Sequence, residues 1–157
     1  MGRYPEAIAF FETAGRAWPE RGANHRGIAE VWLRQGKELS EGLDHAQQAV
    51  EIRHATGLKQ EALNTRLGED LAVLAWALAE NSRPHAEVEP GISEALRLCD
   101  KNTKSTLSEV HYHIGRAYEA PEMTGEAQEH FQHAAEFDPG GLWGRMARER
   151  MRQNSNH

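Results

Sequence analysis

The sequence predicts an all-α protein built from repeated pairs of antiparallel helices. Three observations lead to this prediction: an alanine-rich composition with only six prolines in 157 residues, a pattern of small residues with a period near 40, and apolar stripes with helical spacing. Alanine favours helix, whereas proline and the β-branched residues, which are sparse here, oppose it. A chain of this length is expected to form one domain.

The repeat is visible as two interlocked series of small residues. Four polar turns are each followed by an alanine that opens a helix, at Ala7, Ala46, Ala86 and Ala127, with spacings of 39, 40 and 41 residues. A second series follows the first three of these alanines by 29 residues each, at Gly36, Ala75 and Gly115. We expect small residues at the second series to let two helix backbones cross closely.

Apolar stripes and turn residues place eight helices, at residues 4–17, 24–40, 43–55, 58–80, 90–100, 104–119, 124–136 and 141–153. Pro19 and Gly22 separate the first two helices, Gly57 ends the third, and residues 138–141 separate the last two. The fifth helix is expected to begin at Pro90 rather than at Arg83, because proline suits the first turn of a helix.

The apolar faces indicate which helices cover one another. The second, fourth and sixth helices carry stripes of Trp32, Gly36 and Leu39; of Leu71, Leu74, Ala75 and Leu78; and of Ile114, Gly115 and Tyr118. The first, third, fifth and seventh carry Ala7, Phe10, Phe11 and Ala14; Ala46, Ala49 and Val50; Ile92, Ala95, Leu96 and Cys99; and Ala127, Phe131 and Ala134. The last helix is amphipathic through Leu142, Trp143, Met146 and Met151. Each repeat is therefore predicted to be an antiparallel pair.

Two segments match the pattern W-x2-L-G-x2-Y, A-x3-F, P. One match consists of His111, in place of the tryptophan, with Ile114, Gly115, Tyr118, Ala127, Phe131, Ala134 and Pro139. The other consists of Tyr4, Ala7, Phe11, Ala14 and Pro19, the second half of a copy. The chain thus resembles the tetratricopeptide repeat (TPR) family, in a long-helix variant similar to that of kinesin light chains and of the sensor arms of bacterial transcription activators. The middle copies depart from the pattern at Gln35, Val50, Arg53 and Ser93.

The resemblance implies a right-handed α-solenoid, a TPR-like superhelix. Its parts would be a half repeat at 1–22, repeats at about 23–57, 58–102 and 103–139, and a terminal helix at 140–153. In this family the first helices of the pairs line a concave face that holds an extended peptide or a partner helix.

The predicted register places eight residues on that face. Glu30, Glu69 and Glu109 share one position of the repeat, while Lys37, Trp76 and Arg116 follow the small residues of the second series, and Tyr112 and Glu119 complete the set. Such a groove would suit a partner with basic residues and one apolar anchor. The alternative is that the glutamates are solvated helix residues and that Trp76 belongs to the core.

Composition and motifs exclude several other classes. A net charge of −6 disfavours direct binding to nucleic acid, and no apolar run exceeds the nine residues 71–79, so no membrane partner is expected. The start lacks a secretion signal and there is one cysteine, which predicts a cytoplasmic location. No nucleotide-binding, hydrolase or metalloprotease motif is present, so we expect neither an enzyme nor a cofactor.

The histidines of the last repeat are the remaining candidates for a metal site. His130 and His133 share a helix face, but His111 and His113 are two residues apart, so at most one of them can join that pair. No acidic or cysteine ligand completes the pattern. We therefore expect no metal, with His111 packed in the stripe and the other three histidines on the surface.

Two further features are expected to be structural. Cys99 is predicted to be a buried, inert thiol, because it lies on an apolar helix face. The arginines of the last helix are predicted to form a solvated face, at Arg145, Arg148, Arg150 and Arg152.

The function predicted from the sequence is that of a non-enzymatic protein-interaction scaffold with a protein or peptide partner. The alternative is the sensor or self-association arm of a larger bacterial transcriptional regulator.

Overall fold

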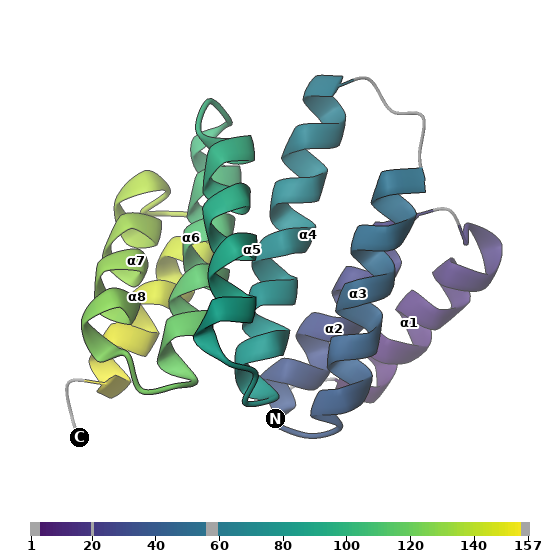
Figure 1. The fold of residues 1–157 in the computed structure, drawn as a ribbon, viewed down its shortest axis with the longest axis horizontal. Coiled ribbons are helices and arrows are strands. Elements are labelled where there is room, and N and C mark those ends of the chain that lie inside the picture. Colours follow the sequence, from purple (N-terminus) through teal and green to yellow (C-terminus); the bar gives the residue numbers. More distant parts are fainter. Residues whose placement is uncertain (1–3, 20, 56–59, 155–157) are drawn as a thin grey trace.

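The computed structural model describes residues 4–19, 21–55 and 60–154. Within these ranges the chain forms helices and no strand, which confirms the all-α prediction. The helices are α1 (Tyr4–Ala17), α2 (Gly22–Gln35), α3 (Leu39–Ala55), α4 (Gln60–Glu80), α5 (His85–Cys99), α6 (Lys104–Glu119), α7 (Thr124–Phe137) and α8 (Leu142–Asn154). They lie side by side from α1 at one end of the molecule to α7 and α8 at the other (Figure 1). The expected end of the third helix at Gly57 lies outside the described residues.

The helices contact one another in two regular ways. α2, α4 and α6 each make their largest contact with the helix that follows, α3, α5 and α7 respectively. α2, α4, α6 and α8 also contact one another in succession, and we call these four the inner row. In the described ranges α3, α5 and α7 make no contact with one another, but α3 also contacts α4 and α5 also contacts α6.

The core has two parts. The larger one joins α2 to α6 and contains Trp76 and Ile92, and the smaller one joins α6, α7 and α8 around Tyr112 and Phe131. Gly115 lies where α6 crosses α7, and a Cβ atom at this position would be 2.7 Å from the Phe131 ring. The expectation of a small residue at this crossing is confirmed.

Gly36 does not have this role, and the prediction for it was wrong. It follows the end of α2 in the left-handed conformation, with φ of 62°, and its N–H donates to the carbonyl of Leu33 at 3.2 Å. No atom lies within 4 Å of the place where its Cβ would be. Glycine adopts this conformation without steric cost, so it ends helices readily. The chain turns here, so α2 ends at Gln35 instead of residue 40, and α3 begins at Leu39 instead of residue 43.

The fifth helix begins at His85, so the predicted start at Pro90 was also wrong, and Pro90 lies inside α5. Packing explains the earlier start. Val88 is buried in the core, and the Tyr118 hydroxyl donates to a carboxylate oxygen of Glu89 at 3.0 Å. These contacts hold the first turn in place although proline supplies no N–H to the helix.

No helix in the described part of the chain is both long enough and apolar enough to cross a lipid bilayer.

Candidate functional site

The inner row brings the three predicted glutamates together around an arginine. Arg26 Nη1 lies 2.6 Å from Glu69 Oε2 and 3.4 Å from Asp70 Oδ1, both on α4. Its Nη2 lies 3.7 Å from Glu109 Oε1 on α6, and its Nε lies 4.0 Å from Glu30 Oε1 on its own helix. One guanidinium thus bridges carboxylates of three inner-row helices.

Two more arginines and a histidine extend this arrangement, which we call the charge network. Arg53 Nε donates to Asp70 Oδ2 at 2.9 Å, and both side chains are buried. Arg34 Nη2 donates to Glu30 Oε2 at 2.8 Å. The ring of His113 is fully buried, with Nε2 3.6 Å from the same Glu30 oxygen.

The charge network keeps an excess of negative charge. Its four carboxylates are Glu30, Glu69, Asp70 and Glu109, and its three guanidinium groups are those of Arg26, Arg34 and Arg53. When all four carboxylates are ionised, they outnumber these three guanidinium groups by one. A positively charged group approaching this face is therefore attracted.

The carboxylates differ in how easily they ionise. Burial raises the pKa of Asp70 and that of Glu109, and Arg26 offsets this only in part. Burial also disfavours the charged form of Glu30, but His113, Arg34 and Arg26 outweigh it and lower the Glu30 pKa. Two glutamates at the same position of the repeat thus have shifts of opposite sign.

The cations of the charge network, Arg26, Arg34 and Arg53, are not among the site residues predicted from the sequence. A signal for them exists, since Arg26 precedes Glu30 by four residues and Arg34 follows it by four, which places all three on one helix face. Arg53 was noted only as a departure from the family pattern, yet it pairs with Asp70.

Trp76, Arg116 and Glu119 also lie together, as predicted, but Trp76 is not an accessible anchor. Its side chain is fully buried, and its Nε1 donates to Glu80 Oε1 at 2.9 Å. The Arg116 guanidinium lies 4.5 Å from the Trp76 ring centroid, while its Nε is 2.9 Å from Glu119 Oε2. The part of the alternative that places Trp76 in the core is confirmed, whereas its other part is wrong, because Glu30, Glu69 and Glu109 are largely buried and paired instead of solvated.

Tyr112 and Lys37 lie elsewhere than predicted. Tyr112 is buried and its ring contacts those of Phe131 and Trp143, so it faces the smaller core. Lys37 is exposed in the turn after α2, because that helix ends early. Periodicity placed both on the inner-row face, but it could not show that α8 covers the end of α6 or that the chain turns at Gly36.

Helix α8 closes the inner row through Trp143. The Trp143 ring centroid lies 4.8 Å from that of His113, and the Arg34 guanidinium lies 5.3 Å from the Trp143 ring. Arg34 belongs to α2, so this contact joins the first and last helices of the inner row. Arg150 also donates to Glu119, which removes it from the solvated face predicted for α8.

Three histidines near the C-terminal end, His111, His130 and His133, contact one another but are not arranged as metal ligands. Nδ1 of His111 lies 3.0 Å from Nδ1 of His130, and the His133 ring is 5.1 Å from that of His111. His113 lies apart from them, as the two-residue spacing predicted, but it is buried rather than on the surface. Among the described residues, no group of three or more histidine, cysteine or acidic side chains is arranged to hold a metal ion.

Burial strongly shifts the pKa values of two further groups, His111 and Cys99. Burial, with the neighbouring His130 and His133, lowers the pKa of His111 to about 3. Burial, with Glu69 and Glu109, raises the pKa of the Cys99 thiol to about 12. Cys99 is buried as predicted, and its thiol is protonated at neutral pH.

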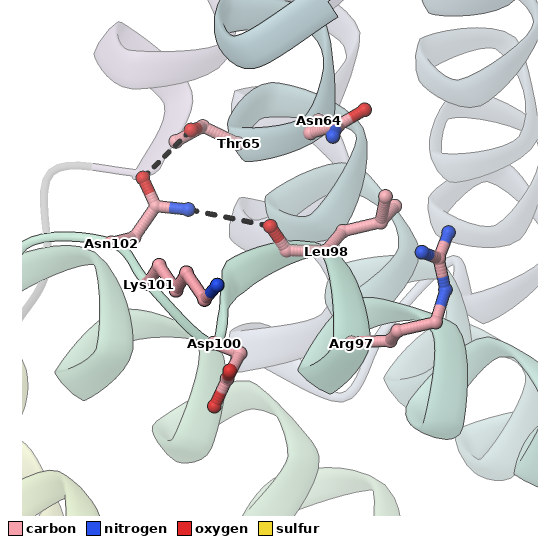
Figure 2. A pocket seen from close by; sticks show the side chains of 7 residues that line it. All are labelled: Asn64, Thr65, Arg97, Leu98, Asp100, Lys101 and Asn102. Carbon is pink, nitrogen blue, oxygen red and sulfur yellow. Dashed lines mark hydrogen bonds between the residues drawn. The ribbon is translucent and has the colours of Figure 1, made fainter.

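A polar hollow of about 360 Å³ lies between α4 and the end of α5 (Figure 2). Thr65 Oγ1 donates to Asn102 Oδ1 at 2.7 Å, and Asn102 Nδ2 donates to the Leu98 carbonyl at 3.4 Å. Asn102 therefore ties the turn after α5 to α4. These bonds give the hollow a structural role.

No protein-family model matches this chain, and no curated protein is significantly similar to it.

Proposed function

We propose that this chain is a TPR-like right-handed solenoid that acts as a non-enzymatic protein-interaction scaffold in the cytoplasm. The succession of inner-row contacts and the pairing of each inner helix with the next one support this architecture. The division into a half repeat, three repeats and a terminal helix follows the same order of helices. The partner would be a protein or peptide segment with basic residues.

The excess negative charge of the inner row is the observation that supports a basic partner. The side chains of Glu30, Glu69 and Glu109 are 13, 12 and 16 % exposed, so each presents an edge to solvent. A lysine or arginine at this edge gains an ion pair without displacing Arg26. Trp76 and Tyr112 take no part, because both are buried. The partner's apolar residues would contact another surface.

A peptide-binding experiment tests this proposal. Lysine- and arginine-rich peptides on an array are probed with the wild-type chain, with Glu109→Gln and with a control, Glu51→Gln, which removes the same charge from an exposed position on α3. Glu109 suits this test because burial already disfavours its charged form, so its neutralisation spares the fold. We expect Glu109→Gln to weaken binding and Glu51→Gln to leave it unchanged. Equal binding by all three proteins would contradict the proposal.

The second candidate function is that of a sensor or self-association arm of a larger bacterial transcriptional regulator. Helix α1 favours it, because Phe10 is 68 % exposed and α1 contacts only α2 among the described helices. Measurement of the native protein's mass distinguishes the two. A mass that includes a DNA-binding domain would support the arm, and a mass equal to that of 157 residues would exclude it.

A further inference from the structure

Helix α8 carries a basic surface on an acidic chain. The helix packs against α6 and α7 at one end of the molecule (Figure 1). Residues of α8 alone line a hollow of about 430 Å³, which we call the α8 hollow. These residues are Leu142, Arg145, Met146, Arg148, Glu149 and Arg152. Three guanidinium groups thus lie beside one carboxylate, although the formal net charge of the chain is −6.

The three arginines of the α8 hollow have no carboxylate partner in the described part of the chain. No aspartate or glutamate there lies within ion-pair distance of Arg145, Arg148 or Arg152. Arg150, on the same helix, differs from them because it binds Glu119 of α6. The positive charge of the α8 hollow is therefore available to carboxylates of another molecule.

Backbone carbonyls hold these guanidinium groups in place. Arg145 Nη1 donates to the Gly140 carbonyl at 2.8 Å, and Arg148 Nη2 donates to the Pro139 carbonyl. Arg152 Nε donates to the carbonyl of Arg148 at 3.3 Å. Each of these bonds uses one N–H group, so other N–H groups of the same guanidinium can bind a carboxylate. A side chain that is already held loses less conformational entropy when a partner binds.

The α8 hollow also has an apolar part. Leu142 is 53 % exposed, and Met146 is partly buried against the smaller core. The two residues are four apart in the helix, so they lie on one side of α8. A partner with charged groups alone would leave Leu142 in water. A partner that also carries an apolar side chain would remove apolar surface from water at this place.

We propose that the α8 hollow is a docking surface for an acidic peptide segment of a partner protein, with one apolar residue among its carboxylates. The carboxylates bind Arg145, Arg148 and Arg152, and the apolar side chain contacts Leu142 and Met146. The α8 hollow shares no residue with the charge network and selects the opposite charge. Its binding of an acidic segment is therefore independent of the basic partner proposed for the inner row.

A nucleic acid fits the α8 hollow less well than an acidic peptide does. The side chains of a peptide can be spaced around Glu149, whereas a phosphate backbone is charged along its whole length. The residues that line the hollow include no aromatic ring on which a base could stack. Leu142 and Met146 also offer a contact that an apolar side chain can use and a phosphate cannot.

Fluorescence anisotropy with labelled peptides tests the docking surface. The probe is a short peptide of glutamates with one central leucine. Two comparison peptides carry serine in place of the leucine or glutamine in place of every glutamate. We expect the wild type to bind the glutamate–leucine peptide most tightly, with a dissociation constant in the micromolar range or above that rises with salt, because exposed ion pairs are weak. Absence of binding up to about 1 mM protein would overturn the proposal.

Two double variants with the same net charge separate the α8 hollow from the overall charge. Arg145→Gln with Arg152→Gln removes two exposed cations from the hollow, and Arg66→Gln with Arg97→Gln removes two exposed cations from α4 and α5. The first should weaken binding of the glutamate–leucine peptide at least about fivefold, and the second should change it less than about twofold. Circular dichroism should show unaltered helix content in both, because all four residues are exposed. Equal weakening by the two double variants would overturn the proposal.

Leu142→Ser tests the apolar contact without a change of charge. It should weaken binding of the leucine peptide and leave that of the serine peptide unchanged. Equal loss for both peptides would contradict the place proposed for the apolar residue.

Labelled single-stranded DNA with the same number of charges as the peptide is the last probe. We expect it to bind more weakly than the glutamate–leucine peptide. DNA that binds the wild type more tightly, and that loses binding in the variant with Arg145→Gln and Arg152→Gln, would replace the peptide as the partner and overturn the proposal.

Discussion

Arg26→Met is the sharpest test of the charge network, because it removes the one group that touches carboxylates on α2, α4 and α6. Methionine retains much of the aliphatic volume of the arginine, so the change acts mainly on charge. The Arg26 side chain is only 15 % exposed, and its partner Asp70 is completely buried. The carboxylates left behind therefore have limited access to water.

The contacts of Arg26 determine how much stability the variant should lose. Removal of one partner from a buried ion pair costs about 3–5 kcal/mol, because an uncompensated charge remains in a poor solvent. Arg53 still binds Asp70, and Glu109 keeps an exposed edge, so we expect the lower end, about 3 kcal/mol at pH 7. At roughly 2–4 °C for each kcal/mol, the melting temperature should fall by about 6–12 °C.

The loss of stability caused by Arg26→Met should become smaller as the pH falls. Asp70 and Glu109 have raised pKa values in the folded protein, and loss of Arg26 raises them further. A group whose pKa is higher in the folded state than in the unfolded chain takes up its proton first when folded, so acid favours the fold of the variant. Protonated carboxyls also no longer need the missing cation.

Urea unfolding of wild type and variant at pH 7 and pH 5 measures both effects. The control is Arg97→Met, which breaks the exposed pair with Glu94 on α5 and should leave the midpoint unchanged. An Arg26→Met variant that is no more destabilised than this control, or that loses as much stability at pH 5 as at pH 7, would contradict the predicted role of Arg26.

Four other variants give three separate tests. Gly115→Leu should lower the free energy of unfolding by about 2 kcal/mol, because even a Cβ would contact Phe131 at 2.7 Å, and an unchanged melting curve would contradict the predicted crossing. Glu30→Gln should destabilise the protein at pH 7 whereas Glu109→Gln should not, because His113, Arg34 and Arg26 together outweigh burial and lower the pKa of Glu30, whereas burial outweighs the neighbours of Glu109 and raises its pKa. Chemical denaturation of both variants checks the difference. Wild-type stability should fall as the pH drops below about 6.5, because the pKa of His111 is about 3 when folded, and His111→Gln should make unfolding midpoints less sensitive to pH in this range.

The helices whose packing follows the regular repeat pattern could be predicted from the sequence. The helices of the last repeat lie within one residue of their predicted bounds, since Ala127, Phe131 and Ala134 cover Gly115 and Tyr112 in a regular pattern. The convergence of Glu30, Glu69 and Glu109 also followed from the period, because residues at one repeat position lie on one face of successive helices.

The turn after α2 could not be predicted, since the same sequence marker has two structural roles. Gly36 and Gly115 keep the register of the repeat, yet one ends a helix and the other lies inside one. The turns after α4 and α6 contain left-handed residues at Ser82 and Glu122, which lie 40 residues apart, whereas the turn after α2 has two, Gly36 and Glu38, which precede Ser82 by 46 and 44. Spacing alone does not reveal whether a glycine serves a close crossing or a positive φ.

The charge network gives the repeats unequal roles, and this affects how the protein should unfold. Arg26 of α2 binds Glu109 of α6, and Arg34 of α2 stacks on Trp143 of α8, so both contacts bypass α4. In an ideal helical repeat array each unit contacts only its neighbours, and unfolding can proceed from either end. Here the opening of α8 exposes Trp143 and removes the cover of Arg34 on α2. The helices from α2 to α8 are therefore expected to unfold together, whereas α1, which contacts only α2 among the described helices, can separate first.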